Sequence, residues 1–188
     1  MRIIAGSARG RAIVAPAGEK TRPTQDHVRE SLFNIIRWDV QEAHVLDLFA
    51  GTGALSLEAI SRGAKDAVLI DMDRDACNAI KKNMETSRLG AQCRLISGDY
   101  RQAMDALAHE GKKFDLVFID PPYRMDNTGD MCAELMDKGL LSGSFLIVVE
   151  HKRGMAPLLD LRFEAFDLRK YGDTEITFVR SANREETP

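Results

Sequence analysis

The sequence has no long apolar run, and this absence excludes a membrane-spanning protein. Crossing a bilayer takes about 20 consecutive apolar residues, and no stretch of the 188 residues approaches that length. Residues 1–6 also lack the apolar stretch of a secretory signal. We therefore expect a cytoplasmic protein that does not act at a membrane.

Cysteine and histidine are scarce, which argues against a metal site or a disulfide framework. The chain has three cysteines and four histidines. Cys77, Cys93 and Cys132 stand far apart without a Cys-x-x-Cys pair, a pattern typical of reduced side chains in a cytoplasmic protein. Because no cluster of His and Cys has the spacing of zinc ligands, the sequence predicts no bound metal.

Internal repeats, low-complexity segments and an interdomain linker are also absent, so one domain is expected. A chain of 188 residues can bury a sizeable core, and its 44% hydrophobic content is ordinary for a soluble protein. Residues 1–37 carry seven basic and three acidic side chains (net +4), whereas the remainder carries 19 and 26 (net −7). This asymmetry is compatible with a basic arm that binds nucleic acid and equally with a solvated basic surface.

Strand patterns and helix patterns alternate along most of the chain. Short apolar runs predict buried strands, and apolar residues every three or four positions predict helices. Strands are expected at 44–49, 67–70, 92–96, 114–119 and 145–150, and helices at 24–38, 54–62, 75–89, 101–110 and 128–138. Such alternation predicts right-handed β-α-β units, in which a parallel sheet has helices on both faces.

Both ends of the chain depart from this alternation. Residues 2–6 and 11–15 flank a glycine-containing turn and predict a small β-hairpin. Residues 163–171 and 175–180 read as two strands without a helix between them, so they predict an antiparallel hairpin. The expected fold class is α/β: a Rossmann-like, mostly parallel sheet of seven strands that ends in this hairpin.

An aspartate stands at or near the end of four successive predicted strands. Asp47 lies in the first strand, and Asp71, Asp99 and Asp120 follow the second, third and fourth. Ligands of open α/β sheets bind at this edge. Each aspartate alone could equally be a helix N-cap or a turn residue, but four on one edge favour a ligand site.

A glycine turn joins the first strand to the helix that follows it. Gly51 and Gly53 let a ligand approach the backbone closely, and the start of a helix favours a negative group. A dinucleotide-binding turn would carry a third glycine where this chain has Ser56. Asp71 follows Gly51 by 20 residues, the distance at which an acidic side chain commonly binds ribose hydroxyls.

The fourth strand leads into Asp120-Pro121-Pro122-Tyr123, the most informative motif of the chain. Two adjacent prolines hold the neighbouring carbonyls stiffly, and the tyrosine ring offers a flat face to a nucleobase. Asp120 and the Pro121 carbonyl supply hydrogen-bond acceptors but no nucleophile, which suits an exocyclic amine. The alternative is a Pro-Pro loop without chemistry.

From Val45 onward these motifs resemble the class I S-adenosylmethionine-dependent methyltransferases. Asp-Pro-Pro-Tyr is similar to the signature of enzymes that methylate the exocyclic amine of a nucleobase or a glutamine amide. Residues 2–6, 9–11 and a long, specific string at 21–34 resemble the bacterial 16S ribosomal RNA guanine-N2 methyltransferase family. His27 departs from the family pattern, which has arginine at that position.

The resemblance implies S-adenosylmethionine as the cofactor. Asp47 and the glycine turn would hold its methionine portion, Asp71 its ribose hydroxyls and Asp99 its adenine amine, with Met72 packed against the adenine. The implied cofactor-binding residues are Asp47, Phe49, Ala50, Gly51, Thr52, Gly53, Asp71, Met72, Asp99 and Tyr100. The implied methyl-transfer residues are Asp120, Pro121, Pro122 and Tyr123, with the tyrosine stacked on the base.

The resemblance also implies a partner, 16S rRNA within the small ribosomal subunit or its assembly intermediate. A basic hairpin arm and loop at 1–23 would contact the RNA, and 24–188 would form the methyltransferase domain. The implied RNA-binding residues are Arg2, Arg9, Arg11, Lys20, Arg22, Thr24 and Arg29. A monomer without a metal is expected.

Other functions remain open at this point. A DNA or RNA amino-methyltransferase that acts on another base would share Asp-Pro-Pro-Tyr, although the DNA enzymes need a recognition domain for which this chain has no room. A protein glutamine methyltransferase more often has Asn in place of Asp120. An NAD-dependent oxidoreductase would need the missing third glycine, and a non-catalytic RNA-binding module would leave the four aspartates unexplained.

Overall fold

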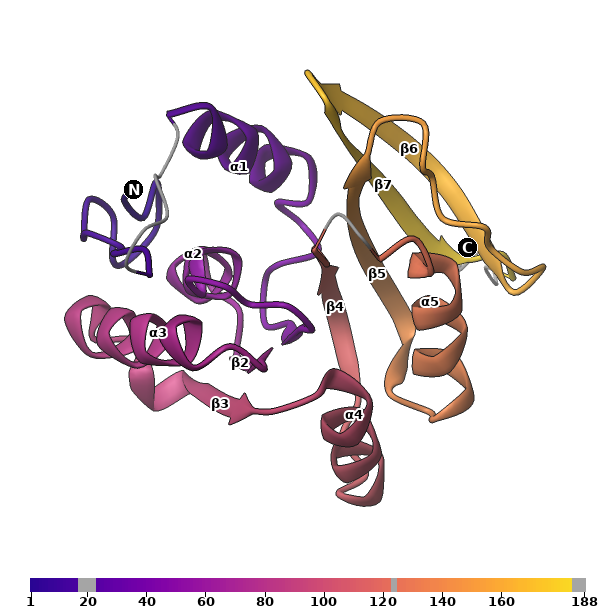
Figure 1. The fold of residues 1–188 in the computed structure, drawn as a ribbon, viewed down its shortest axis with the longest axis horizontal. Helices are drawn as coiled ribbons and strands as arrows, with labels where there is room; N and C mark the ends of the chain where they lie inside the picture. The colour runs from indigo at the N-terminus through magenta and orange to yellow at the C-terminus, as the bar shows by residue number, and fades with distance from the viewer. Residues whose placement is uncertain (17–22, 123–124, 184–188) are drawn as a thin grey trace.

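The structure is a computed structural model that describes residues 1–16, 23–122 and 125–183. A seven-stranded sheet in the order β3-β2-β1-β4-β5-β7-β6 forms its centre (Figure 1). The strands are β1 (His44–Asp47), β2 (Asp66–Asp71), β3 (Cys93–Ser97), β4 (Phe114–Ile119), β5 (Leu141–Lys152), β6 (Phe163–Tyr171) and β7 (Thr174–Ser181). The helices are α1 (Pro23–Ile35), α2 (Ala54–Ser61), α3 (Arg74–Ser87), α4 (Tyr100–His109), α5 (Thr128–Asp137) and the short 3-10 helix η1 (Gly90–Gln92). No helix in these ranges is long and apolar enough to cross a membrane.

Strand direction in the sheet agrees with the prediction. β1 pairs in parallel with β2 and β4, β2 with β3, and β4 with β5. β7 runs antiparallel to both of its neighbours, β5 and β6. The mostly parallel α/β sheet with a C-terminal antiparallel hairpin is therefore confirmed.

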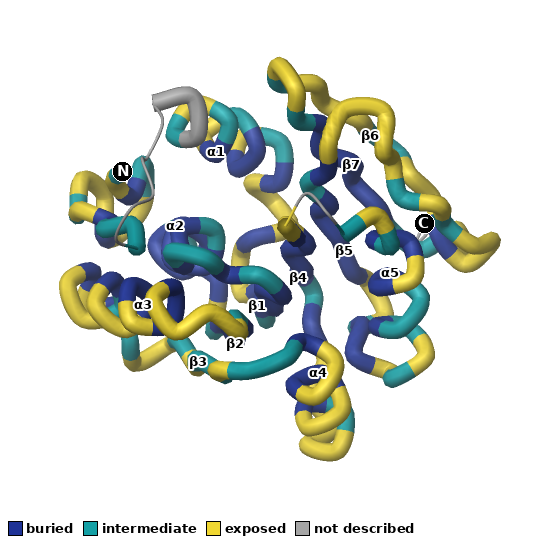
Figure 2. Tube along the Cα trace, in the orientation of Figure 1, coloured by how far each residue is buried: buried dark blue, intermediate teal, exposed yellow. Residues whose placement is uncertain are grey.

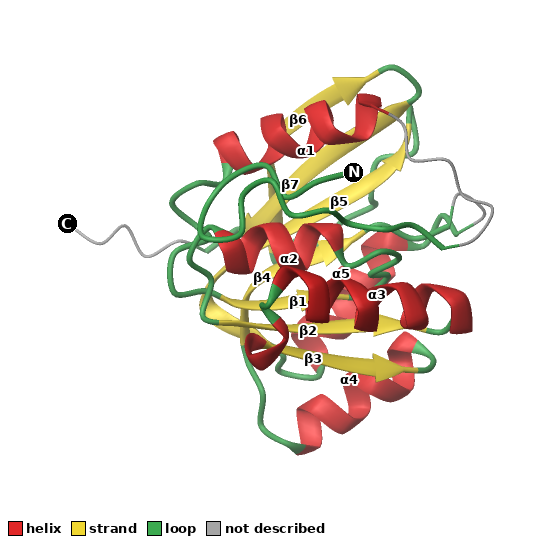
Figure 3. Ribbon diagram, turned by 90° about the vertical axis from the view of Figure 1, so that its left-hand side faces the viewer, coloured by secondary structure: helices red, strands yellow, loops and turns green. Residues whose placement is uncertain are grey.

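Helices cover both faces of the sheet (Figure 3). α1, α2 and α3 lie on one face, where Phe33, Leu57 and Ile80 are 0% exposed. α4 and α5 lie on the other face, where Met104 and Leu135 are buried to the same degree. Successive side chains of a strand point to opposite faces, so each central strand contributes apolar residues to both layers and reads as a continuous apolar run. Figure 2 shows the buried residues gathered in α2 and the central strands.

The bounds of many elements differ from those expected by one to four residues, and α1, β1 and β5 show why. α1 ends at Ile35, because the chain turns there to bury Ile36 while Trp38 remains 75% exposed. β1 ends at Asp47, because the next two residues already enter the turn before α2. β5 covers 12 residues, 141–152, because its start pairs with β4 and its end pairs with β7.

Residues 1–16, which we call the N-terminal segment, pack against α2 and α3 (Figure 1). The expected hairpin is present as backbone pairing around one bridge, Arg2 to Ala12, and is too short to form strands. Ile3 and Ile13 are 1% and 3% exposed and belong to the same core layer as α2. The segment therefore packs with the core of the domain and does not stand away from it.

A buried glutamate holds the N-terminal segment to α2. Glu58 is 0% exposed and accepts hydrogen bonds from the backbone N–H groups of Ile4 (2.7 Å) and Ala5 (3.0 Å). The Arg62 Nε lies 2.7 Å from its carboxylate, and the Nε of buried Arg29 lies 3.8 Å away. Two cations and two N–H donors thus compensate a charge that would be costly to bury alone.

Replacing Glu58 by alanine is expected to lower the free energy of unfolding by about 3–5 kcal/mol, because Arg29 would lose its buried partner. Chemical denaturation followed by circular dichroism measures this change. Glu85→Ala, at an exposed position of α3, is the matched control and should change stability by no more than about 0.5 kcal/mol. If the Glu58 variant is as stable as the control, apolar contacts alone hold the segment.

Candidate active site at the carboxyl edge of the sheet

The structure brings the four predicted aspartates together at one edge of the sheet. The strand order places β3, β2, β1 and β4 side by side, and the carboxyl ends of parallel strands share an edge. Asp47 ends β1 and Asp71 ends β2, while Asp99 and Asp120 follow β3 and β4. This edge is the candidate active site.

Asp47 is the most deeply buried of the four, with 1% of its surface exposed. Ser56 of α2 donates a hydrogen bond to its carboxylate at 2.9 Å. Burial, aided by repulsion from Asp120 and Asp71, raises the pKa of Asp47 to about 7 despite that hydrogen bond. A positive group placed beside Asp47 would favour its ionised form.

The turn of residues 49–53 has a fixed backbone and an open side. Gly51 and Gly53 have φ angles of 55° and 74°, in the left-handed region that favours glycine. The Gly53 N–H donates to the Ala50 oxygen at 2.6 Å. A Cβ added to Gly53 would lie 3.0 Å from Leu69, whereas a Cβ added to Gly51 would meet nothing within 4 Å. A ligand can therefore approach the backbone at Gly51.

Asn83 of α3 connects this turn to the N-terminal segment. Its side-chain amide donates to the carbonyl oxygens of Thr52 and Val14, each at 2.9 Å, and accepts from the Val14 N–H at 2.9 Å. Asn83 is 0% exposed, so water does not compete for these bonds. The glycine turn and the N-terminal segment thus share one buried support.

Asp71 holds the turn and keeps acceptor capacity. Its carboxylate oxygens accept hydrogen bonds from the backbone N–H groups of Gly51 at 2.8 Å and Asp73 at 2.9 Å. Each carboxylate oxygen has a second acceptor position, so Asp71 can also bind hydroxyl groups. Met72, the next residue, is 75% exposed and offers an apolar, polarizable surface to a flat ring.

Asp99 is the N-cap of α4, the alternative role considered for it from sequence, and keeps one oxygen available. Its Oδ1 accepts from the N–H groups of Arg101 at 2.9 Å and Gln102 at 3.4 Å. Among the described residues no donor reaches Oδ2. Tyr100 is 5% exposed, and its ring centroid lies 5.1 Å from that of Phe49. The Tyr100 side chain therefore supports the glycine turn from the core.

Asp120, Pro121 and Pro122 follow β4 directly, whereas Tyr123 lies outside the described residues. Pro121 is buried, and Asp120 and Pro122 border solvent. The Pro122 oxygen accepts a hydrogen bond from the Met125 N–H at 2.8 Å. No described residue donates a hydrogen bond to the Asp120 carboxylate, so its acceptor positions are available to a ligand.

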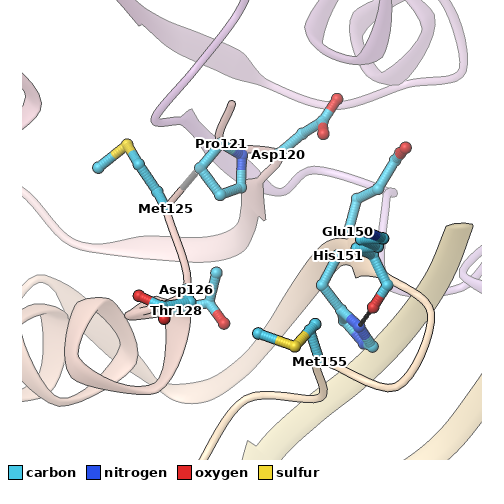
Figure 4. A pocket seen from close by; sticks show the side chains of 9 residues that line it. Asp120, Pro121, Met125, Asp126, Thr128, Glu150, His151 and Met155 are labelled. Atoms are coloured by element: carbon cyan, nitrogen blue, oxygen red, sulfur yellow. Dashed lines mark hydrogen bonds between the residues drawn. The ribbon is translucent and has the colours of Figure 1, made fainter. Parts of the chain in front are cut away.

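Glu150 of β5 is a candidate site residue that the sequence analysis missed. Ile119 pairs with Val149 in the parallel register of β4 and β5, so Asp120 and Glu150 follow as neighbours, and their carboxylates point to the same side (Figure 4). Exclusion of water by the surrounding protein raises the pKa of Asp120 to about 6, although the residue borders solvent. Burial and repulsion by Asp120 raise the pKa of Glu150 to about 8. The available signal was a glutamate at the end of the predicted strand 145–150.

A hollow beside the motif lies on the opposite face of the sheet. Leu116 and Phe118 of β4 pack in the layer of α1, α2 and α3, so Asp120 points to that layer by alternation. The hollow is lined by Asp120, Pro121, Met125, Asp126, Thr128, Glu150, His151, Lys152 and Met155. In Figure 4 the carboxylates of Asp120 and Glu150 point away from Met125 and Met155. The two carboxylates therefore lie at the border of the hollow and are directed to the α1 layer.

Acceptors and negative charge dominate this edge, and they indicate which ligand fits. S-adenosylmethionine carries an ammonium group, ribose hydroxyls, an adenine amine and a positively charged sulfur, which are donors or cations, and only one anionic group, its carboxylate. Asp47, Asp71, Asp99 and the open backbone at Gly51 suit that set. A dinucleotide carries an anionic pyrophosphate, which the same carboxylates would repel. Among the described residues no group of His, Cys, Asp and Glu could hold a metal ion.

The predicted RNA-binding residues of the N-terminal segment differ in exposure. Arg9 is exposed, and Arg2 is exposed while donating a hydrogen bond to the Gly10 oxygen at 2.9 Å. Arg11 is half-buried and donates to the Ser87 oxygen of α3. Arg2 and Arg9 therefore remain the best placed of the three to contact RNA.

Arg29 has a supporting role in place of the expected RNA contact. It is 4% exposed, its guanidinium donates to the Arg2 oxygen and pairs with Asp26 at 3.2 Å, and it faces the buried Glu58 described above. Burial lowers the pKa of Arg29, and both carboxylates oppose that shift. Lys20 and Arg22, and the side chain of Thr24, lie outside the described residues.

Comparison with known proteins assigns the chain to a family. Residues 1–180 match a family model described as Conserved hypothetical protein 95. The chain belongs to this family. Its curated relatives include the Ribosomal RNA small subunit methyltransferase D of Escherichia coli (strain K12), 42% identical over 150 residues, or 80% of this chain and 74% of the relative. The Putative rRNA methyltransferase YlbH of Bacillus subtilis (strain 168) is 37% identical over 153 residues, or 81% of this chain and 83% of the relative.

Solved structures share the fold of this family member. The Putative methyltransferase yhhF from Escherichia coli matches with a TM-score of 0.83 and 35% identity, over 98% of this chain and 99% of that chain. SMU.776, a putative methyltransferase complexed with SAH, matches with a TM-score of 0.68 and 18% identity, over 85% of this chain and 50% of that chain. The second match is a likeness of fold.

Affinity for S-adenosylmethionine is expected to rise between about pH 6 and 8, because Asp47 becomes anionic there and attracts a cation. Burial raises the pKa of Asp47 to about 7, and this value sets the window. S-adenosylhomocysteine lacks the sulfonium charge. The ratio of the affinity for S-adenosylmethionine to that for S-adenosylhomocysteine should therefore grow roughly tenfold across this pH window, which corresponds to about 1.4 kcal/mol. Isothermal titration with both compounds measures the ratio. Asp47→Asn should flatten its pH dependence, and a ratio independent of pH in the unmodified protein would contradict the electrostatic account.

Proposed function

We propose that this chain transfers a methyl group from S-adenosylmethionine to the exocyclic N2 amine of a guanine in 16S rRNA. Family membership and the printed names of the relatives support the broader function, an S-adenosylmethionine-dependent methyltransferase of small-subunit rRNA. The choice of amine rests on the acceptor groups at Asp120 and Pro121. The substrate we propose is the small ribosomal subunit or its assembly intermediate, methylated in the cytoplasm by a monomer.

The carboxylate of Asp120, to which no described residue donates a hydrogen bond, carries this proposal. An exocyclic amine is a weak nucleophile because its lone pair is delocalised into the ring, and its two protons need acceptors. The Asp120 carboxylate and the stiff Pro121 carbonyl can accept them and so orient the nitrogen. Positive charge grows on that nitrogen as the methyl group arrives, and an ionised Asp120 stabilises it.

The donor side and the acceptor side of the reaction are adjacent. Asp47 of β1 pairs in register with Phe118 of β4, two residues before Asp120. When bound, S-adenosylmethionine supplies a methyl group on a positively charged sulfur. Asp47, Asp71 and Asp99 would hold the donor at its ammonium, ribose and adenine ends, and the main task left to the protein is alignment with the amine.

A guanine must leave its base stack to reach this edge. The cost of unstacking is a few kcal/mol, and stacking on an aromatic ring in the site offsets part of it. Tyr123, which follows the two prolines, is placed by the sequence to supply that ring. The proposal therefore includes a flipped guanine that stacks on Tyr123.

RNA recognition is proposed to come from the N-terminal segment and the rim of the site. Exposed Arg2 and Arg9 can contact phosphates, which positions an RNA but reads little sequence. Among the described residues, those after β1 form the sheet, its helices and short connections. These described residues form no separate domain that could read an RNA sequence. We therefore propose that the protein recognises a folded RNA or a ribonucleoprotein by its shape.

The other functions fit the site less well. An NAD-dependent oxidoreductase would place a pyrophosphate beside several carboxylates, and Ser56 occupies the position of the third glycine while it donates to Asp47. A glutamine methyltransferase shares the amine chemistry but leaves the exposed arginines of the N-terminal segment without a role. An amino-methyltransferase that acts on adenine or cytosine is the rival closest in chemistry.

Asp120→Asn is expected to lower kcat by about 10²–10³-fold, because the neutral amide no longer stabilises the positive nitrogen. The dissociation constant of S-adenosylmethionine should change by less than about threefold, since Asp120 faces the amine side. Methyl transfer to small subunits from cells that lack this enzyme gives kcat, and isothermal titration gives the dissociation constant. Asp130→Asn, at an exposed position of α5, is the control, and near-normal turnover of the Asp120 variant would refute the assignment.

Methylation is expected to weaken steeply with added salt, because contacts between arginines and phosphates release counterions. Replacing Arg2 and Arg9 together by alanine should raise the apparent KM for the small subunit about tenfold or more and reduce the salt slope, because both side chains are exposed. The affinity for S-adenosylmethionine should stay unchanged in this variant. Salt-independent activity, or full activity of the double variant, would remove the N-terminal segment from the RNA-binding surface.

A further inference from the structure

The motif at Asp120 accounts for an amine but not for the choice of base. Adenine, cytosine and guanine all carry an exocyclic amine, and acceptors for its protons would serve each of them. Discrimination needs a second group that reads the atom next to the amine. Glu150 is the described side chain nearest to Asp120 along the edge, one strand further on.

The β-sheet register fixes how these two side chains lie. Because Ile119 pairs with Val149, Asp120 and Glu150 are lateral neighbours on strands about 4.8 Å apart. Both carboxylates point to the same side in Figure 4, and the longer Glu150 side chain extends its carboxylate from β5. The carboxylates of Asp120 and Glu150 therefore lie side by side along the edge of the sheet.

Neither carboxylate of this pair has a partner within the described parts of the chain. No hydrogen bond or ion pair reaches Glu150 or Asp120 from a described residue. On the other side of Glu150, β7 places Ile176, which is apolar and 1% exposed. Two adjacent carboxylates repel each other, and both can accept hydrogen bonds from a ligand with two adjacent donors.

We propose that Glu150 selects guanine by accepting a hydrogen bond from its N1–H while Asp120 accepts from its N2 amine. This proposal rests on the proposed function and names the residue that gives that function its base specificity. Guanine has a donor, N1–H, directly beside its amine. In adenine and cytosine the ring nitrogen beside the amine is an acceptor, whose lone pair would face the Glu150 carboxylate.

The energetic consequence of a wrong base is larger than the loss of one contact. Adenine or cytosine would leave Glu150 without a donor and place a ring lone pair against a carboxylate, so desolvation and repulsion both oppose binding. Sites built to hydrogen-bond a substrate N–H reject analogues that lack it more strongly than apolar pockets reject a missing methyl group. The pKa of Glu150 agrees with this role, because burial and repulsion by Asp120 raise it in the free protein, and two donors would allow both groups to ionise.

The test compares two bases that share the amine and differ at N1. 2-Aminopurine keeps the exocyclic amine at C2 but has an unprotonated N1. Small subunits are assembled from 16S rRNA in which the methylated guanine, located by mass mapping, is replaced through ligation by 2-aminopurine. The unmodified enzyme is expected to prefer guanine by at least tenfold in kcat/KM, and Glu150→Met should bring the two bases within about threefold of each other. Isothermal titration should show the affinity of Glu150→Met for S-adenosylmethionine within twofold of the unmodified protein.

Glu150→Gln and Glu164→Met complete the design. Glutamine keeps an oxygen acceptor and the size of the side chain but lacks the charge, so Glu150→Gln should lower the preference for guanine over 2-aminopurine at least threefold. This variant decides the question alone if Glu150→Met does not fold. Glu164, an exposed glutamate of β6, is the matched control, and Glu164→Met should keep the full preference.

The outcomes separate the two proposals. An unchanged preference for guanine in both Glu150 variants overturns the role of Glu150, and so does an equal fall of activity on both bases. In each of those cases the proposed function stands, because the unmodified enzyme still methylates the guanine amine. If the unmodified enzyme methylates neither substrate, the proposed function fails, and the role of Glu150 fails with it.

Discussion

The parallel arrangement of the first five strands, β1 through β5, is the constraint on which the candidate site depends. It brings the carboxyl ends of five neighbouring strands to one edge, and in this chain those ends carry acidic side chains. Exclusion of water raises the pKa values of Asp47, Asp120 and Glu150, and repulsion between neighbouring carboxylates adds to the shifts of Asp47 and Glu150. The fold therefore tolerates a group of neighbouring acidic side chains that is unfavourable for stability. A cationic ligand rich in hydrogen-bond donors would relieve this cost, and such a conflict between stability and function is common at functional sites.

Several residues of this edge support the fold and still keep acceptor positions that a ligand could use. Asp71 anchors the glycine turn through the Gly51 N–H, and Asp99 caps α4, yet each retains acceptor positions. Backbone donors hold these carboxylates in place before any ligand arrives. Such preorganisation lowers the entropy that binding would otherwise cost, so the structural and functional readings of an aspartate at a strand end are compatible.

Local pattern was sufficient to predict the sheet and the edge at which the four aspartates lie. Alternating apolar runs placed the strands, and the position of each aspartate at a strand end located the edge. Glu150 escaped because its meaning depends on the lateral register of β4 and β5, which sequence spacing does not encode. Arg29 was misjudged for a similar reason: a basic residue in a basic region resembles its neighbours until its burial beside Glu58 is known.

The docking of the N-terminal segment has a consequence for how this protein can vary. Glu58 and Asn83 hold the segment through main-chain atoms of Ile4, Ala5 and Val14, and not through their side chains. Any residue that keeps the backbone path can occupy these three positions, except proline, which lacks the N–H. The outer surface of the segment is thus free to diverge and to adapt to a different RNA, while its attachment beside the glycine turn stays the same.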